Sequence, residues 1–185
     1  QNWKNKKFLT KILYNKKMRT FFNNYLKEFV YGATDGTVTT FAIIAGSAGA
    51  QLPATIVIIL GVSNVLADGF SMASSNYLSE KSHRDQNDLE ATISSFKNAF
   101  ATFISFILVG SIPVLPYVAN AIWGIWQKTF FVSCIFTFFA FLFIGQIRGH
   151  ISQKSHLKSS LETLIIGGVA ATVAYSVGAF LDKII

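Results

Sequence analysis

Asp35 is a carboxylate within residues 31–50, a stretch that otherwise has the length and apolar character of a membrane helix. At about 1.5 Å of rise per residue, this stretch reaches roughly 30 Å, which matches the hydrocarbon core of a bilayer. A carboxylate at that depth is costly and usually faces a cavity, a partner or an ion. Glu28 lies seven residues earlier, about two helical turns away, so it shares a stripe with Asp35. This face is a candidate cation site.

A second apolar stretch carries Asn64, Asp68 and Met72, each four residues after the one before. On a helix this spacing drifts by only about 40° per step, so the three side chains share one stripe. Oxygen donors beside a soft thioether suit a borderline transition metal such as ferrous iron better than magnesium or calcium, which take oxygen ligands. We therefore predict a metal site from five residues: Asp35, Met72, Asp68, Asn64 and Glu28.

Both aspartates also have a structural interpretation. Each is followed by glycine, and the Asp-Gly pairs at 35–36 and 68–69 could mark helix breaks where the side chain caps a helix end or bonds to a neighbouring helix. For Asp35 we favour the functional interpretation. For Asp68, which lies nearer the end of its stretch, the two interpretations are equal.

Other reactive residues do not form recognisable sites. The three histidines, His83, His150 and His156, have a spacing that fits no known metal site, so we interpret them as exposed loop residues. The single cysteine, Cys134, excludes an intrachain disulfide and a cysteine-based metal site. No nucleophile, base and orienting residue occur together, and no glycine loop for a nucleotide is present, so we do not expect an enzyme.

The composition indicates an all-α integral membrane protein. Of 185 residues, 51% are hydrophobic and only 14% are charged, and the charges are segregated from long apolar stretches. These stretches predict five transmembrane helices, at about 29–50, 54–77, 98–118, 121–145 and 161–181. Pro113 and Pro116 lie near the end of the third, where a helix can kink or stop.

The distribution of basic residues predicts the orientation. If the amino terminus is cytoplasmic, fourteen of the sixteen Lys and Arg residues lie on the cytoplasmic side and the carboxyl terminus lies opposite. The bias toward Lys, Asn, Ile and Phe favours a bacterial inner membrane over a vacuolar membrane.

Residues 1–27 are predicted to be a basic cytoplasmic segment ahead of a transport domain at 28–185. Phe8 and Ile12 could form the apolar side of a helix lying on the membrane, although a partly ordered basic tail is an equal alternative. In front of a membrane span, such a segment indicates attraction to anionic lipid rather than to nucleic acid.

Small residues predict close helix packing. Gly32 and Gly36 form a small-residue face on the first span, which Gly46 extends. One Asp and one Met cannot fill the coordination sphere of a divalent cation. A second copy, packed on Gly32 and Gly36 of the first helix about a two-fold axis, would double both ligands, so we predict a homodimer.

The chain resembles the vacuolar iron transporter family, including its short nodulin-like and bacterial members. The resemblance rests on residues 35–46 (DGTVTTFAIIAG), 67–72 (ADGFSM) with 77–79 (YLS), and is supported by 113–117, 165–171 and 174–178. It covers most of the chain from Glu28 to Leu181.

This resemblance implies a five-helix dimer that exports ferrous iron, or a related ion such as manganese, from the cytoplasm in exchange for protons. The ion is a transported substrate, and no tightly bound cofactor is implied. By position, Asp35 corresponds to the carboxylate of the translocation path and Met72 to its thioether partner.

The sequence departs from the family in three places. Residues 79–97 are too short for the Glu-rich cytoplasmic domain of longer members, which leaves Glu80, Asp85, Asp88 and Glu90 as a reduced metal-collecting station. Asn64 and Asn76 stand where other members have Glu. The alternatives are therefore a manganese-selective carrier and a membrane scaffold or regulator that transports nothing.

Overall fold

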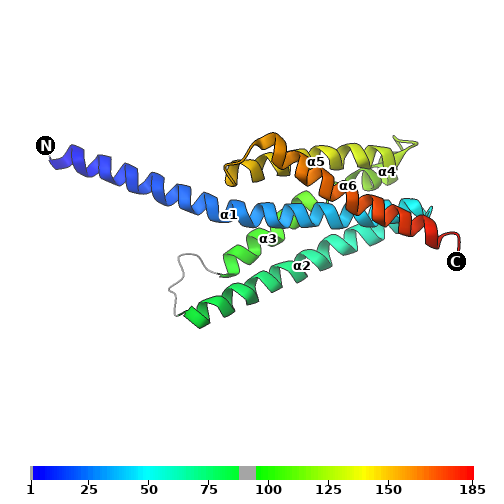
Figure 1. The fold of residues 1–185 in the computed structure, drawn as a ribbon, viewed down its shortest axis with the longest axis horizontal. Helices are drawn as coiled ribbons and strands as arrows, with labels where there is room; N and C mark the ends of the chain where they lie inside the picture. Colours follow the sequence, from blue (N-terminus) through cyan, green and yellow to red (C-terminus); the bar gives the residue numbers. More distant parts are fainter. Residues whose placement is uncertain (1, 88–94) are drawn as a thin grey trace.

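The structure is entirely helical over the residues that it describes, as predicted. The computed structural model describes residues 2–87 and 95–185, with side chains for 25–84 and 95–185, and no strand occurs in these ranges. Its six helices are α1 (Asn2–Gly49), α2 (Ala54–Asn87), α3 (Ser95–Gly110), α4 (Leu115–Trp123), α5 (Thr129–Ile151) and α6 (His156–Leu181) (Figure 1). Asp88 and Glu90, and the side chains of Phe8, Ile12 and Asp85, lie outside this description.

Among the described residues, three helices are long and apolar enough to cross a membrane: α5, α6 and the Ala54–Arg84 part of α2. The helices α3 and α4 meet the same criterion only as a pair, bent by 50° at the break between them, so the described residues contain three to four candidate spans. The break between them contains Pro113, and Pro116 lies in the first turn of α4, which confirms the predicted interruption because proline lacks the amide hydrogen that a helix interior needs. The chain is an integral membrane protein.

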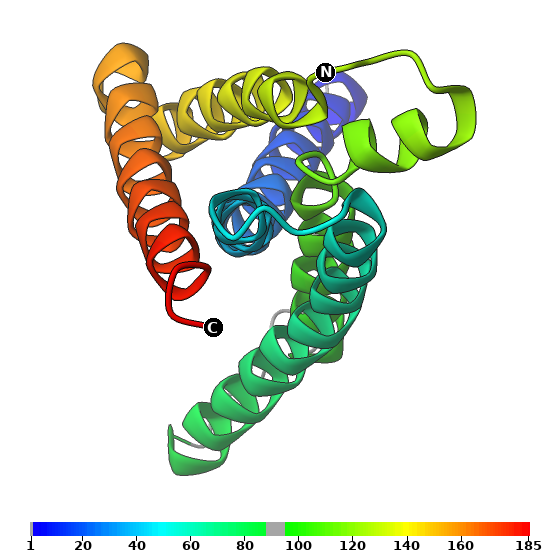
Figure 2. The ribbon, with the colours of Figure 1, turned by 90° about the vertical axis from the view of Figure 1, so that its right-hand side faces the viewer.

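The central helix of the bundle is α1, which packs against α2, α3, α5 and α6 (Figure 2). It contains the predicted first span, yet it is not among the helices that are apolar enough by composition to cross a membrane. Thr37 and Thr40 are fully buried along it, and the Thr37 hydroxyl donates to the Ala33 carbonyl oxygen at 2.7 Å. Small and hydroxylated residues suit α1 because its neighbours are helices rather than lipid.

The fourth long helix, α5, begins later than the fourth predicted span. Whereas the prediction starts at 121, α4 continues to Trp123 and α5 begins only at Thr129. Gly124 ends α4 with a left-handed φ of 62°. Asn120 closes the turn, because its Oδ1 accepts from the backbone N–H of Trp126 at 2.7 Å and its Nδ2 donates to Thr129 Oγ1 at 2.9 Å. These two local hydrogen bonds hold the turn between α4 and α5.

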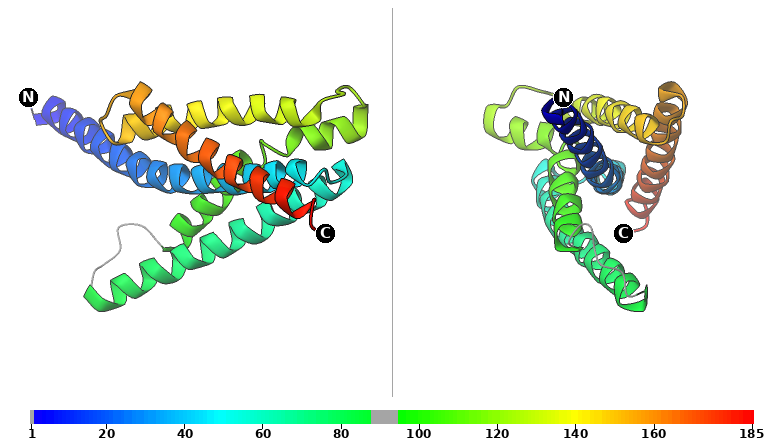
Figure 3. Two further views of the ribbon diagram at one scale, coloured as in Figure 1. Left: turned by 45° about the vertical axis from the view of Figure 1, so that its right-hand side comes forward. Right: turned by 90° about the vertical axis from the view of Figure 1, so that its left-hand side faces the viewer.

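The helices α1 and α6 cross in backbone contact near their carboxyl-terminal ends (Figure 3). A Cβ atom at Gly178 would collide with the carbonyl oxygen of Gly46, and one at Gly49 would collide with that of Tyr175. Only glycine fits at these two positions, because the opposing atoms belong to a backbone that cannot move aside as a side chain can. The crossing fixes the carboxyl-terminal end of α1.

Candidate functional site

A cavity of about 670 Å³ opens beside the amino-terminal half of residues 25–49, the part of α1 whose side chains are described. Glu28 and Asp35 both line it, in agreement with their shared helical stripe. The neighbouring helices contribute one polar side chain each: Asn76 from α2, Arg148 from α5 and Thr163 from α6. The cavity therefore brings a pair of predicted ligands together with residues that are distant in sequence.

Glu28 is held by a closed triangle of hydrogen bonds from two other helices. The Nδ2 atom of Asn76 donates to Glu28 Oε2 at 2.6 Å and to Thr102 Oγ1 at 2.8 Å. The Thr102 hydroxyl donates to the same Glu28 oxygen at 3.1 Å. Sequence reasoning did not single out Thr102, because a threonine in an apolar helix usually bonds only to its own backbone.

Asp35 and Asp68 lie close enough for their charges to interact. The Glu28–Asn76 hydrogen bond joins α1 to α2, which run antiparallel. Asp35 lies seven residues after Glu28 and Asp68 lies eight residues before Asn76, so each aspartate is about two turns from this bond in the same direction along the bundle. Like charges in a partly buried site repel, so a cation or a proton between them lowers the energy. The arrangement can therefore attract a cation.

The remaining predicted ligands lie on the same stripe of α2. Met72 is partly buried and lies one turn from Asp68. Asn64 lies one turn from Asp68 in the opposite direction. The Nδ2 atom of Asn64 is buried without a hydrogen-bond partner among the described residues, and so is Oγ1 of Thr40. Buried polar atoms of this kind are usually satisfied by water or an ion. Within the described ranges, no group of three or more His, Cys, Asp or Glu residues could hold a metal.

The Asp-Gly pairs are not helix breaks, because α1 and α2 run through them without interruption. Gly36 and Gly69 instead allow close approach: a Cβ atom at either would lie 2.9–3.2 Å from the nearest atom of Phe106 on α3. Gly32 likewise packs against Ser105 of α3. The small-residue face of α1 that we predicted would pair with a second copy is therefore occupied by α3 of the same chain. Small residues permit close packing but do not specify which helix approaches.

Two more polar contacts join α2 to α3 beyond the predicted end of the second span at 77. Asn98 Nδ2 donates to both carboxylate oxygens of Glu80, at 2.8 and 2.9 Å. Arg84 donates to Ser95 Oγ. The helix α2 continues to Asn87 because its polar residues bind α3 here rather than entering a loop. Glu80, which we predicted in a metal-collecting station, is engaged in helix packing.

The three histidines are exposed, as predicted, but they lie in helices rather than in loops. His150 and His156 stack, with ring centroids 6.2 Å apart.

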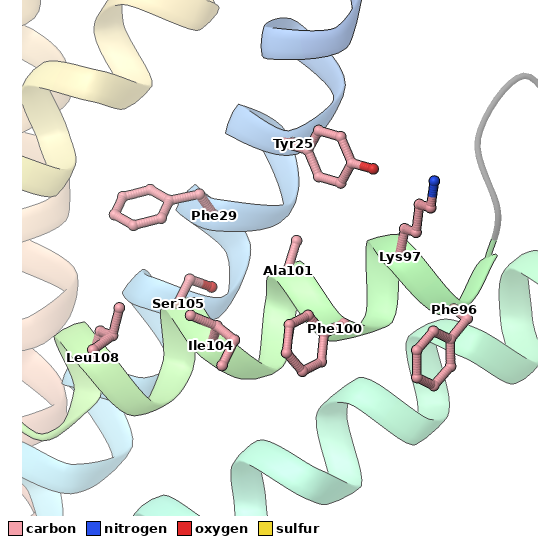
Figure 4. Close-up of a pocket in the computed structure, with 9 residues that line it drawn as sticks. All are labelled: Tyr25, Phe29, Phe96, Lys97, Phe100, Ala101, Ile104, Ser105 and Leu108. Atoms are coloured by element: carbon pink, nitrogen blue, oxygen red, sulfur yellow. The ribbon is translucent and has the colours of Figure 1, made fainter.

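A second cavity, of about 430 Å³, lies between α1 and α3. Its walls are mainly aromatic and aliphatic, including Phe29, Phe100 and Leu108 (Figure 4). No carboxylate among the described residues lines it, and its apolar walls give it the character of a lipid-facing groove.

The sequence is similar to proteins named vacuolar iron transporters. A family model described as the VIT family matches residues 26–92 and 86–179. A vacuolar iron transporter of Toxoplasma gondii is 23% identical, over 88% of this chain and 76% of that protein. Vacuolar iron transporter 1 of Arabidopsis thaliana is 23% identical, over 81% of this chain and 83% of that protein. The vacuolar iron transporter of Plasmodium falciparum is 43% identical over 60 residues, which are 32% of this chain and 22% of that protein.

Proposed function

The chain belongs to the VIT family, and from this premise we propose that it is a membrane transporter that exports ferrous iron, or manganese, from the cytoplasm in exchange for protons. The observation that carries the proposal is the cavity that Asp35 and Glu28 line, with Asp68 of α2 near enough to Asp35 for the two charges to interact. The vacuolar iron transporters among its relatives support iron as the substrate.

In this proposal Asp35 binds the metal and the proton in turn. The two compete because both use the carboxylate oxygens, and the interacting charge of Asp68 strengthens the attraction for either. Met72 adds a thioether on the neighbouring helix, and a soft ligand of this kind favours ferrous iron over magnesium and calcium. In this proposal the metal is selected where Met72 lies beside Asp35 and Asp68.

The same proposal covers the arrangement in the membrane. We count α1 as a fifth span, and we place the amino terminus in the cytoplasm because basic residues concentrate there. Residues 1–27 then precede a transport domain at 28–185. A bacterial inner membrane fits the composition better than a vacuolar membrane.

A second copy of the chain would complete the site. One protomer supplies too few ligands to replace the hydration shell of a divalent cation. The face of α1 that remains open carries Tyr31, which is 56% exposed, together with Thr34, Asp35 and Val38, which line the cavity. We propose that the copies pair across this face, since α3 covers the glycine face. A monomeric mass in mild detergent, with transport intact, would exclude this pairing.

Metal flux into proteoliposomes under an imposed pH gradient tests the function. Asp35→Ala is expected to lower the initial rate for iron and manganese by about 100-fold, because it removes the central ligand. Met72→Ala is expected to retain manganese flux and lose preference for iron. Asp182→Ala is the control, because this exposed carboxylate bonds to Gln51 away from the cavity.

The proposal fails if the parent protein moves neither metal, or if Asp35→Ala moves them as fast as the parent. A protein that folds, dimerises and moves no metal would be the membrane scaffold or regulator instead.

A further inference from the structure

We propose that Glu28 and Asn76 form a capture station for hydrated divalent cations at the entrance of the cavity, built only from oxygen ligands, and that Thr102 positions both residues. This inference rests on the proposed function and assigns roles to Asn76 and Thr102, neither of which belongs to the predicted ligand set. It separates the capture of a cation from its selection deeper in the protein.

The hydrogen-bond triangle fixes how the Asn76 amide is oriented. A carboxylate oxygen accepts hydrogen bonds only, so the atom of Asn76 that lies 2.6 Å from Glu28 Oε2 must be the amide nitrogen. Both hydrogens of that nitrogen are used, one toward Glu28 and one toward Thr102 Oγ1. The amide oxygen, Oδ1, is consequently directed away from the triangle.

The same bonds leave one oxygen of each ligand available. The described side-chain hydrogen bonds of Glu28 both end on Oε2, so Oε1 is not engaged by them. Glu28 and Asn76 both line the cavity, where Oε1 and Oδ1 are the oxygens left to bind a cation. Thr102 does not line the cavity and is fully buried, so it acts through the other two residues.

The position of Thr102 is itself fixed within α3. Its hydroxyl carries one hydrogen, for which Glu28 Oε2 and the backbone carbonyl oxygen of Asn98 are alternative acceptors, each at 3.1 Å. The Asn98 side chain is held by Glu80 of α2. The Asn76–Thr102 bond of the triangle thus continues a row of polar contacts between α2 and α3 that also includes Glu80–Asn98 and Arg84–Ser95. Such supporting contacts orient ligands in metal sites and are often as important as the ligands.

The donor set predicts what the station binds. One carboxylate oxygen and one amide oxygen leave several coordination positions to water, which is how magnesium and similar hard cations are usually held. Oxygen ligands discriminate poorly among magnesium, manganese and ferrous iron, whereas the thioether of Met72 lies one turn deeper on α2. The station is therefore expected to concentrate divalent cations without choosing among them.

Manganese binding by the full chain in lipid nanodiscs tests the inference, with the electron paramagnetic resonance signal of free Mn²⁺ as the readout. The Asp35→Ala background isolates the entrance from the deeper site. We expect Mn²⁺ binding there to be displaced by Mg²⁺, to be weakened about tenfold by Thr102→Val, and to be restored by Thr102→Ser. The matched control is Thr137→Val, because Thr137 is also buried and its hydroxyl donates to the Ser133 carbonyl oxygen of its own helix.

Several results would overturn the station: unchanged binding in Thr102→Val, equal weakening in Thr137→Val, no rescue by serine, or retained binding in Glu28→Gln. Its failure is distinct from failure of the proposed function. If binding follows the expected pattern but the parent protein transports no metal, the station stands and the transporter proposal falls. If transport depends on Asp35 while Thr102→Val binds Mn²⁺ normally, the reverse holds.

Discussion

The segment of α1 whose side chains are described, residues 25–49, is packed by opposite means at its two ends. Near Glu28 the contacts with α2 and α3 are side-chain hydrogen bonds beside an open cavity. Near Gly49 the contact with α6 is backbone against backbone, with no space for even a methyl group. Hydrogen bonds at a cavity can be exchanged for water or an ion, whereas a close-packed backbone contact cannot. The end near Glu28, which we call the open end, can therefore bind a ligand. The end near Gly49, the closed end, holds the bundle together.

Gly178→Ala tests the closed end and is expected to have the largest effect. The new methyl group would collide with the Gly46 carbonyl oxygen, and overpacking of this kind costs about 2–3 kcal/mol. Thermal unfolding in detergent should show a Tm lower by roughly 5–10 °C. Gly168→Ala on the same helix is the control, since nothing lies within 4 Å of its Cβ position. Equal Tm values for the two variants would remove the contrast between the ends.

Asp68→Asn tests the open end at the pair of aspartates, Asp35 and Asp68. If Asp68 attracts the metal together with Asp35, loss of its charge should raise the KM for Mn²⁺ flux about tenfold, which is about 1.4 kcal/mol of binding free energy. The alternative interpretation of Asp68 is a packing or capping residue. An unchanged KM with a lower Tm would support that alternative.

Arg148→Gln tests the charge of the cavity wall and is expected to have the smallest effect. Arg148 lines the cavity together with Lys27 and pairs with Glu162 at 3.0 Å. Removing one positive charge should lower the KM for Mn²⁺ about two- to threefold at low salt, and less at high salt. Lys128→Gln, an exposed charge beyond the other end of α5, should change nothing. A KM that does not depend on salt would show that the wall charge has no part in capture.

The amino-acid sequence determined the class of protein and the charged face of the candidate site. Apolar stretches of membrane length and segregated charges predict an all-α membrane protein, and Pro113 with Pro116 predicts the interruption between α3 and α4. Helical periodicity predicts that Glu28 and Asp35 share a face, and both line one cavity. These features were predictable because each depends on residues within one helix, where a spacing of 3.6 residues per turn fixes which side chains lie together.

Only the tertiary structure decided which helices meet. Gly32 and Gly36 were compatible with any close neighbour, and the bundle places α3 there rather than a second copy. Thr102 is 74 residues from Glu28 in sequence, yet it holds the carboxylate in place. Helix pairing depends on the complementarity of whole surfaces across the bundle, and no periodicity within one helix encodes it. The sequence therefore identified the charged face of α1, and the fold supplied the partners that orient it.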